Sequence, residues 1–435
     1  MTTSLTELRK SLDHAVEHQD IELLYGPDPD KKQRRVERIA HLLNLFEEIY
    51  GDTSDIRLFS TPGRSEISGN HTDHQQGRVL VAAIDPDIIC AVRPHDEPYI
   101  RFQSEGFARV DYINITDLEV RPEEEGRSAA MIRGVLRGLK DRGYEIGGFD
   151  AYSTSLVPAG SGLSSSAAFE VAVCGILNHL YNDGRVPPLE QAQICQFAEN
   201  VFFGKPSGLL DQMGCAVGGF AYVDFRDPEH PEVEQIQAPF EDADIHLVLT
   251  GTGGSHSDLT HCYADIPAEM KQVAQFFDEE VLREVDPEDF YASLGALSKT
   301  LPSRAILRAM HFFDEDHRVS EQRIALLGRD IHTFLDLVNE SGRSSQLLLQ
   351  NIYNPEEPKD QPLSLALAVS EHILSRSEGA WRIHGGGFAG TIQAFVAGNT
   401  LEQYVAAMDA IFGEGSAQVM QIRPVGTWQL FKDES

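Results

Sequence analysis

The chain has 435 residues, and its 36 basic and 68 acidic residues give a formal net charge of −32. This length exceeds one ordinary domain and indicates two. Because so negative a surface repels nucleic acid and anionic membranes, we expect neither as a partner, and an anionic ligand would need local backbone N–H groups, a metal ion or a few chosen cations.

The sequence carries no signal for a membrane or for secretion. No apolar run approaches the roughly 20 residues that cross a bilayer, and residues 1–20 are polar with helical spacing, without the apolar core of a signal peptide. The cysteines are odd in number, widely spaced and mostly in apolar surroundings, which favours reduced core thiols over a zinc site or disulfide framework. They are Cys90, Cys174, Cys195, Cys215 and Cys262. We therefore predict a cytoplasmic protein.

The first half of the chain predicts helices, then strands and helices in mixed order. Residues 1 to about 50 have helical spacing, and the segment 33–51 places apolar residues on one face and ends in glycine. Further strands are expected at 55–61, 77–84, 87–94, 148–156 and 218–225, and further helices at 128–143, from the serines at 164–166 to residue 182, and at 188–204.

The second half predicts a strand at 245–252, a helical block over about 265–350, a loop at 354–362, a helix, and two strands joined by a glycine-rich turn. The polar, proline-containing segment 227–240 is taken as close to a domain boundary. Because strands and helices alternate without a regular βαβ rhythm, the pattern favours an α+β fold over a doubly wound parallel sheet.

Polar side chains are unusually dense in residues 61–84, "TPGRSEISGNHTDHQQGRVLVAAI". An arginine, a glutamate, an asparagine, an aspartate, two histidines and two glutamines stand between glycines and run directly into an apolar strand. So many hydrogen-bonding groups at the mouth of a sheet mark the stretch as a candidate binding site.

A glycine- and serine-rich loop, "PAGSGLSSSAAFEVA" at 158–172, opens a predicted helix. Gly160 and Gly162 allow a tight turn and a close approach to a ligand. The free N–H groups and the dipole of the helix favour an anion there, and a serine hydroxyl can reach a phosphate or a magnesium ion. An ordinary serine-capped helix would have the same spacing. The sequence contains no Walker P-loop.

Two other stretches are candidates for chemistry. In "HGGGFAGTIQAFVAG" (384–398), three glycines match a dinucleotide fingerprint, but a strand rather than a helix follows, so we reject that interpretation in favour of a close-packed turn. In "AENVFFGKPSGLLDQMG" (198–214), Glu199 and Asp211 lie in apolar surroundings, where a carboxylate needs a partner, a metal or a catalytic role. A solvated helix face would explain Glu199 equally well.

These stretches, in this order, resemble the motifs of the GHMP kinase superfamily and, within it, of the galactokinase family. "TPGRSEISGNHTDH" resembles that family's signature, "PAGSGLSSSAAFEVA" its phosphate loop, "SGLLDQMG" the segment with the catalytic aspartate and "RIHGGGFAG" its third motif. Weaker similarities occur at 308–319 and 339–346. The resemblance covers most of the chain from about residue 35.

The resemblance implies a two-lobed GHMP kinase fold with its active site in the cleft between two domains. It divides the chain into an N-terminal extension over 1–34, which we expect to be helical, an N-terminal domain over 35–235 and a C-terminal domain over 236–435. The implied activity is ATP-dependent phosphorylation of the anomeric C1 hydroxyl of a hexose, with sugar and ATP as the partners, magnesium as the metal and a monomer as the state of the protein.

The resemblance also implies roles for single residues. Asp211 would accept the C1 hydroxyl proton, and Arg64 beside it would favour the ionised carboxylate and neutralise developing charge. Ser166 and Glu199 would hold the magnesium ion. The ATP phosphates would be wrapped by Gly160, Ser161, Gly162, Leu163, Ser164, Ser165 and Ser166. The sugar hydroxyls would be met by Asn70, His71, Asp73, the backbone at Gly208, and Tyr263. Gly385, Gly386 and Gly387 form the third motif beside the phosphate loop and sugar.

The chain departs from the galactokinase pattern in the signature itself. Asn70 stands where the family carries the glutamate that holds the sugar's 6-hydroxyl, Glu66 stands where asparagine is usual, and His74 replaces a tyrosine. The basic residues usual after Tyr263 are also missing. An amide N–H can donate to a carboxylate at C6, so galacturonate is a rival substrate, although an amide can equally accept from the 6-hydroxyl of galactose.

Three other interpretations are weighed against a galactokinase. Some relatives are sugar sensors that bind ATP and sugar without catalysis, but their serine stretch is shortened, whereas residues 164–168 are complete here. A kinase for mevalonate or homoserine would not need the hexose segment with its aspartate–arginine pair. A metal site at His71, Asp73 and His74 is disfavoured because magnesium prefers oxygen ligands and zinc a more regular set.

Overall fold

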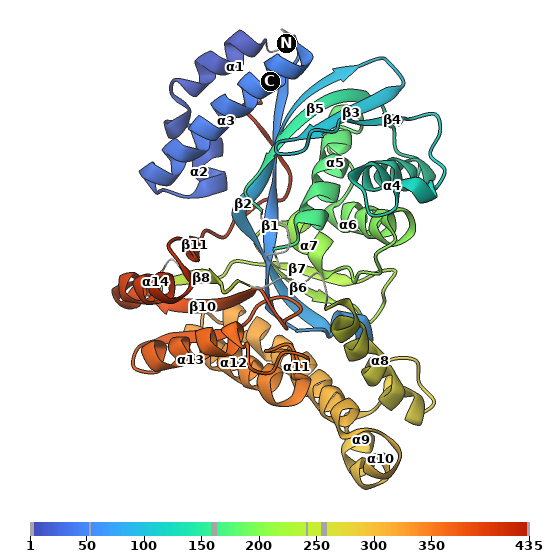
Figure 1. Cartoon of the computed structure of the whole chain (residues 1–435), viewed down its shortest axis with the longest axis vertical. Coiled ribbons are helices and arrows are strands. Elements are labelled where there is room, and N and C mark those ends of the chain that lie inside the picture. Colours follow the sequence, from blue (N-terminus) through green and yellow to red (C-terminus); the bar gives the residue numbers. More distant parts are fainter. Residues whose placement is uncertain (1–3, 52–53, 158–162, 241, 254–258, 433–435) are drawn as a thin grey trace.

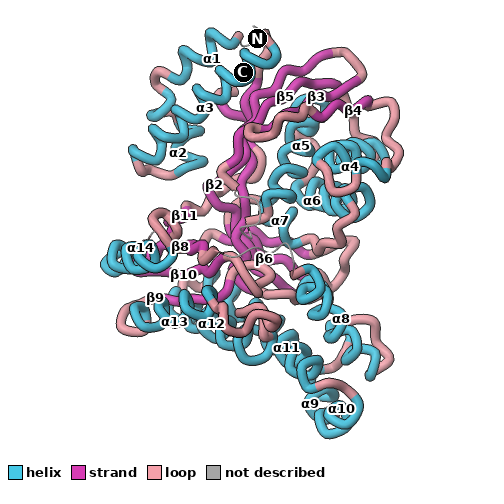
Figure 2. Tube along the Cα trace, in the orientation of Figure 1, coloured by secondary structure: helices cyan, strands magenta, loops and turns pink. Residues whose placement is uncertain are grey.

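The computed structural model describes residues 4–51, 54–157, 163–240, 242–253 and 259–432. In this part of the chain, helices cover two β-sheets, and the long first sheet reaches down to the second beside β6 and β7 (Figure 1, Figure 2). Strands and helices are mixed along the chain without a repeating βαβ unit. The α+β class predicted from the sequence is thus confirmed.

The first sheet has the strand order β12-β1-β2-β5-β3-β4, with β6 pairing with β2 and β7 pairing with β6. Its pairs are antiparallel, except that β3 and β5 are parallel. The strands are β1 (Arg57–Ser68), β2 (Arg78–His95), β3 (Tyr99–Ser104), β4 (Asp111–Asn114), β5 (Gly148–Ser155), β6 (Phe220–Asp224), β7 (Glu232–Ile236) and β12 (Trp428–Leu430).

Strand β2 is one long strand where the sequence predicts two. It pairs with β1 along its length, while its other edge pairs first with β6 and then with β5. Pro86 is accommodated because the register with β1 shifts between Pro62 and Gly63, which leaves residues 85 and 86 outside the regular ladder. A bulge of this kind is where a strand tolerates proline, which has no N–H to donate.

Helices cover both faces of the first sheet (Figure 1). The N-terminal helices lie on one face, and the helices between β4 and β6 lie on the other. The helices of the N-terminal face are α1 (Leu5–Leu12), α2 (Gln19–Tyr25) and α3 (Pro29–Tyr50); those of the opposite face are α4 (Ser128–Asp141), α5 (Ser165–Tyr181), α6 (Pro188–Phe197), the π-helical turn η4 (Ala198–Phe203) and α7 (Leu210–Val217). The helix predicted at 33–51 is confirmed as α3, which Asp28 caps and Gly51 ends.

The second sheet has the order β11-β8-β10-β9 and is antiparallel. One of its faces packs on α13 and α14 through Val248, Ile392 and Ala394, and the other joins the core of the first sheet through Leu247 and Phe395. Its strands are β8 (Ile245–Gly251), β9 (Gly379–Ile383), β10 (Thr391–Ala397) and β11 (Ala417–Met420), and the helices of this half are α8 (Thr260–Phe276), α9 (Pro287–Ala292), α10 (Leu294–Thr300), α11 (Ser303–Leu327), α12 (Ile331–Ser344), the π-helical turn η6 (Ser345–Leu349), α13 (Pro362–Leu374) and α14 (Gly398–Phe412).

Two segments connect differently from the sequence-based expectation. The polar segment 227–240 is not only a connection, because it contains β7, which extends the first sheet beside β6. Near the end of the chain, β12 returns to the first sheet and pairs with β1. Both ends of the described chain therefore meet on that sheet, where Phe431 N–H and Trp428 Nε1 donate to the Asp20 carboxylate at 2.7 and 3.0 Å.

All five cysteines are buried and free, which agrees with the prediction of core thiols. Of the helices that the structure describes, none combines the length and apolar character needed to cross a bilayer.

The N-terminal helices are held to the sheet by a buried carboxylate at the β2 bulge. Asp87 accepts hydrogen bonds from Tyr25 Oη at 2.8 Å and Arg38 NH1 at 2.6 Å, and it also contacts the Ser60 hydroxyl. Arg423, from the C-terminal segment, lies 3.6 Å away. Three distant parts of the chain thus meet at one charge that has to be paired because it is buried.

We predict that Tyr25→Phe lowers the free energy of unfolding by about 1–2 kcal/mol, because the buried Asp87 loses a donor. Urea denaturation checks this value. Tyr112→Phe is the matched control, since Tyr112 is 60% exposed and should change stability little. Equal stability of Tyr25→Phe and the unaltered protein would show that this hydrogen bond does not anchor α2.

Candidate active site

Strand β1 reaches the candidate site directly after its register with β2 shifts between Pro62 and Gly63. A side chain at Gly63 would lie 3.2 Å from Val157 Cγ2 and 3.3 Å from the Leu163 carbonyl oxygen, so the strand passes very close to the glycine- and serine-rich loop. The next residue, Arg64, donates its backbone N–H to that carbonyl at 3.5 Å. The bulge therefore brings the polar end of β1 against the start of α5.

Arg64 and Asp211 form a close ion pair, as the sequence predicts for the catalytic pair. Arg64 Nε and NH2 donate to Asp211 Oδ1 at 2.8 and 2.6 Å. The Arg64 side chain is 6% exposed, whereas that of Asp211 is 30% exposed and can meet a ligand. Burial raises the pKa of Asp211, but attraction to Arg64 and a hydrogen bond from Ser164 outweigh it, so its pKa lies below the usual range and the carboxylate is ionised at neutral pH.

The loop residues that the structure describes lie beside this pair. Ser164 has left-handed backbone angles (φ 58°, ψ 57°) and precedes the first turn of α5. Within the described residues its side chain does not cap the helix, so the N–H groups of the first turn are available to an anion. The predicted phosphate-binding residues Gly160, Ser161 and Gly162 lie outside the described residues, whereas Leu163 and Ser165 are described.

Glu199 lies in the π-helical turn η4 and is 1% exposed. Its Oε1 accepts from Ser166 Oγ at 3.0 Å and Lys205 Nζ at 2.8 Å. Its Oε2 accepts from Ser207 Oγ at 2.7 Å and Gln212 Nε2 at 2.8 Å. The sequence-based hypothesis of a solvated helix face at Glu199 is therefore wrong. The contacts with Lys205, Ser207 and Gln212 were not predicted, although all three residues stand in the stretch singled out at 198–214.

The residues predicted to hold magnesium fit that ion in their chemistry. The Ser166 hydroxyl and the Glu199 carboxylate bring two hard oxygen donors within 3.0 Å of each other. The Lys205 ammonium already neutralises this carboxylate from one side. In the parts of the chain that the structure describes, no group of three or more histidine, cysteine, aspartate or glutamate residues could hold a metal ion, and His71, Asp73 and His74 form no such group.

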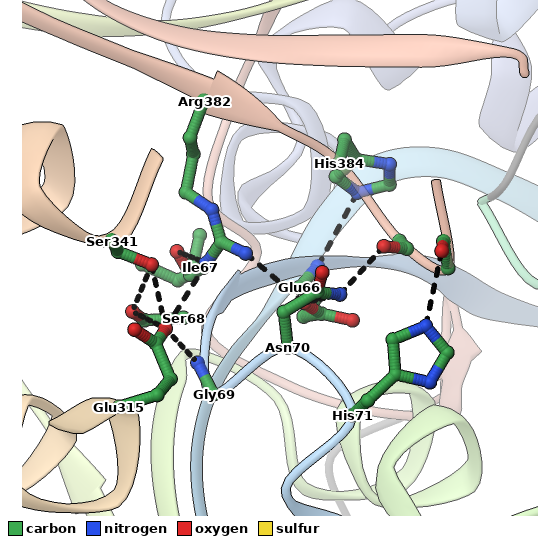
Figure 3. Close-up of polar contacts among 12 residues, drawn as sticks. Glu66, Ile67, Ser68, Gly69, Asn70, His71, Glu315, Ser341, Arg382 and His384 are labelled. Carbon is green, nitrogen blue, oxygen red and sulfur yellow. Dashed lines mark hydrogen bonds and ion pairs between the residues drawn. The ribbon is translucent and has the colours of Figure 1, made fainter. Parts of the chain in front are cut away.

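Asn70 and His71 lie against the glycines of the third motif (Figure 3). Asn70 Nδ2 donates to the Gly385 carbonyl at 2.7 Å and to Glu66 Oε1 at 2.8 Å. His71 Nε2 contacts the Gly386 carbonyl at 3.0 Å, which requires the proton on that nitrogen. The turn between β9 and β10 thus packs directly on the polar stretch after β1, and it leads into a strand, as predicted.

The remaining predicted sugar ligands, Asp73 and Tyr263, each lie close against a glycine, and the first of these glycines is the predicted Gly208. A side chain at Gly208 would be 2.0 Å from Asp73 Oδ2, and one at Gly386 would be 2.5 Å from Tyr263 Cε1. Tyr263 Oη also donates to the Gly387 carbonyl at 2.8 Å. The five predicted sugar ligands therefore fall into two groups, with Asp73 against Gly208 and the others around the third motif.

Behind the polar stretch is a buried charge network that the sequence analysis did not predict (Figure 3). Glu315 accepts from Ser341 Oγ at 2.6 Å, Ser68 Oγ at 3.0 Å and Gly69 N–H at 3.0 Å. Burial alone would raise the pKa of Glu315, but Arg318 and Arg382 lower it well below its usual range. The weaker family similarities at 308–319 and 339–346 contain Glu315 and Ser341, and they were the only available signal.

Arg382 and Asn351 connect this network to Asn70. Arg382 lies 3.4 Å from Glu66 Oε1 and 4.0 Å from Glu315 Oε1, and it is fully buried. Asn351 Nδ2 donates to Asn70 Oδ1 at 2.7 Å. Asn351 is placed by the π-helical turn η6 and by the left-handed Gln350 (φ 61°), so local sequence patterns give no indication of this contact.

Comparisons with known proteins agree with this arrangement. Residues 130–219 match the GHMP kinases N terminal domain, and residues 44–94 match the galactokinase galactose-binding signature. Galactokinase from Streptomyces coelicolor is 30% identical over 382 residues, which cover 87% of this chain and 94% of that protein. Galactokinase from Lactococcus lactis subsp. lactis is 28% identical over 380 residues, with 86% and 92% coverage.

Solved structures give the same result. The crystal structure of Lactococcus lactis galactokinase complexed with galactose superposes with a TM-score of 0.77 at 25% identity, covering 90% of this chain and 100% of that one. Methanococcus jannaschii mevalonate kinase, with a TM-score of 0.59 at 15% identity and coverages of 84% and 98%, shares the fold alone. With the GHMP kinase fold, the galactose-binding signature and a relative of this identity and coverage, the chain belongs to the galactokinase family.

Proposed function

We propose that this protein transfers the γ-phosphoryl group of ATP to the C1 hydroxyl of D-galactose, giving galactose 1-phosphate and ADP. The observation that carries the proposal is the Arg64–Asp211 ion pair, which the Ser164 hydroxyl joins from the start of α5. An ionised, partly exposed carboxylate beside a helix N-terminus places a proton acceptor next to a site suited to phosphates.

In this mechanism Asp211 takes the proton of the C1 hydroxyl while the sugar oxygen forms its bond to the γ-phosphorus and the bond to the ADP oxygen breaks. Arg64 keeps the carboxylate ionised and neutralises charge that develops during transfer. Residues 160–165 and the first turn of α5 would bind the phosphates. Ser166 and Glu199 would hold magnesium, which would offset the negative charge of the phosphates during transfer.

The sugar would lie between Asp73 and Gly208 on one side and His71, Tyr263 and the third motif on the other. We place this site between the parts of the chain assigned to two domains, 35–235 and 236–435. Most of the catalytic residues come from the first part, whereas the turn at 385–387 and Tyr263 come from the second. The rigid contacts among these groups position them before a sugar arrives, which favours productive binding.

Galacturonate is the weaker substrate hypothesis. It depended on an Asn70 amide that donates to a carboxylate at C6, but both donors of that amide are directed to Glu66 and Gly385. A non-catalytic sensor is disfavoured because the Asp211–Arg64 pair is formed and because the serine stretch 164–168 is complete.

We also propose a monomer in the cytoplasm, on the basis of the family resemblance and the five buried, unpaired thiols.

A substrate panel tests the function directly. The purified protein with magnesium and ATP should form ADP in the presence of D-galactose, and much more slowly with D-galacturonate or without sugar. The measurement is a coupled assay for ADP, combined with identification of the phosphorylated carbon by ³¹P NMR. Turnover with galacturonate alone would replace the proposed substrate, and sugar-dependent thermal stabilisation without turnover would favour a sensor.

We predict that Asp211→Asn lowers kcat for galactose by at least about a hundredfold, because the amide cannot accept the hydroxyl proton. ATP binding, measured by calorimetry, should remain close to that of the unaltered protein, since no phosphate-binding group is removed. Asp227→Asn, an exposed substitution outside the site, is the control for loss of one negative charge. Near-normal turnover of Asp211→Asn would contradict its role as the proton acceptor.

Replacing Arg64 should change the pH dependence of the reaction. Burial raises the pKa of Asp211, and in Arg64→Met no guanidinium opposes this effect. The Asp211 carboxylate is therefore protonated at a higher pH than in the unaltered protein. The acidic limb of kcat, measured at saturating galactose so that it reports the sugar-bound enzyme, should therefore move to higher pH, which a profile between about pH 4.5 and 8 reports. The control is Arg137→Met, on an exposed helix face, which should leave the acidic limb in place. An unmoved limb in Arg64→Met would mean that Arg64 does not set the pKa of Asp211.

A further inference from the structure

The two unusual residues of the galactose-binding signature contact each other. The family pattern has asparagine at position 66 and glutamate at position 70, whereas this chain has Glu66 and Asn70. In the structure Asn70 Nδ2 donates to Glu66 Oε1 at 2.8 Å (Figure 3). A carboxylate and an amide are therefore still hydrogen-bonded in this corner of the site, but each stands at the other's position.

Asn70 has no hydrogen-bond donor left for a sugar. Its side chain is fully buried, with 0% exposure of the residue. Both amide hydrogens are engaged, one with Glu66 and one with the Gly385 carbonyl, and its Oδ1 accepts from Asn351. A sugar hydroxyl could reach the remaining lone pair of Oδ1 only by displacing the groups that bury Asn70, and any buried group left unpaired by that change would oppose binding.

Glu66, in contrast, keeps one oxygen uncommitted. Oε1 accepts from Asn70 and lies 3.4 Å from Arg382 NH2, whereas Oε2 has no hydrogen-bond partner among the described residues. Burial leaves the ionised Glu66 carboxylate with few hydrogen-bond donors when no ligand is bound. It raises the pKa of Glu66 to about 7, although the charges of Arg382 and Arg64 oppose this effect. A hydroxyl at Oε2 would supply such a donor.

Glu66 is on the same side of β1 as Arg64. It lies two residues from Arg64 in β1, and side chains two apart in a strand point to the same face. The charges of Arg64 and Asp73 both act on Glu66. The carboxylate thus lies between the groups assigned to catalysis and sugar binding, whose charges it senses, and Arg382 of the buried network.

We propose that Glu66 is the residue that accepts a hydrogen bond from the sugar's hydroxymethyl group, in place of residue 70, and that it selects neutral hexoses against hexuronates. The inference rests on the proposed function and adds the residue that determines its specificity. A hexuronate would bring a second carboxylate next to Glu66. Arg382 could not relieve the repulsion, because it is fully buried and already lies between Glu66 and Glu315.

Glu66→Gln tests the proposal with an isosteric side chain. Loss of a hydrogen bond to a charged acceptor should raise KM for galactose about tenfold, with kcat changed less than about threefold. The ratio of kcat/KM for galactose to that for galacturonate should fall by at least about tenfold, since the repulsion is removed. Assays at pH 8 keep Glu66 ionised in the unaltered protein. Glu37→Gln, an exposed change of the same charge, is the control and should alter neither value.

Reciprocal exchange provides a second test that does not depend on one variant folding well. Glu66→Asn leaves two amides and Asn70→Glu leaves two carboxylates at this contact, so each single variant should bind galactose more weakly. The double variant restores one carboxylate and one amide, and its KM should return to within about threefold of the unaltered protein. Thermal shifts caused by galactose without ATP report binding separately from turnover.

The outcomes separate the two proposals. If the unaltered protein uses galactose but Glu66→Gln keeps its KM and its selectivity, the role of Glu66 is wrong and the kinase proposal stands. If the double variant binds no better than the weaker single variant, the exchange of roles is also wrong. If the unaltered protein neither turns over nor binds galactose, the proposed function itself fails.

Discussion

Strand β1 is buried along almost its whole length although it carries polar and charged side chains, and much of the structure follows from the need to pair them. Buried polar groups require hydrogen-bond partners. Ser65 and the Ile67 carbonyl find theirs in Gln393, and Ser68 finds its partner in Glu315, all more than 240 residues away in the chain. The second half of the chain therefore has to dock on β1, and the same contacts bring the third motif to the candidate active site.

The distribution of charge follows the same constraint. The chain is strongly acidic, yet its largest fully buried side chains include Arg133, Arg308, Arg382 and Arg423. Each lies beside carboxylates or carbonyl oxygens, so these four cations are not available to ligands. At the candidate site, Arg64 and Lys205 are each already bonded to a carboxylate. Anion binding in so negative a protein thus depends on a few paired cations and a helix N-terminus.

Several of the site residues lie in irregular backbone. Glu199 lies in one π-helical turn, Asn351 follows another, and a bulge directs β1 toward the start of α5. His71 and Ser164 have left-handed backbone angles. Such features persist only where surrounding contacts hold them. They are also features that periodicity misses, which explains why two strands were predicted at 77–84 and 87–94 where β2 is one strand with a bulge.

The sequence by itself determined the α+β class, the capped helix α3, the strand after the glycine turn, and the identity of the residues in the three family motifs. These depend on neighbours within a few positions, so composition, spacing and resemblance can indicate them. Only the tertiary structure decided that both donors of Asn70 are bonded, that Glu66 keeps an oxygen without a partner among the described residues, and that Glu315, Arg382 and Asn351 support them. The physical reason is that a hydrogen bond between side chains 247 to 316 residues apart leaves no trace in either local pattern.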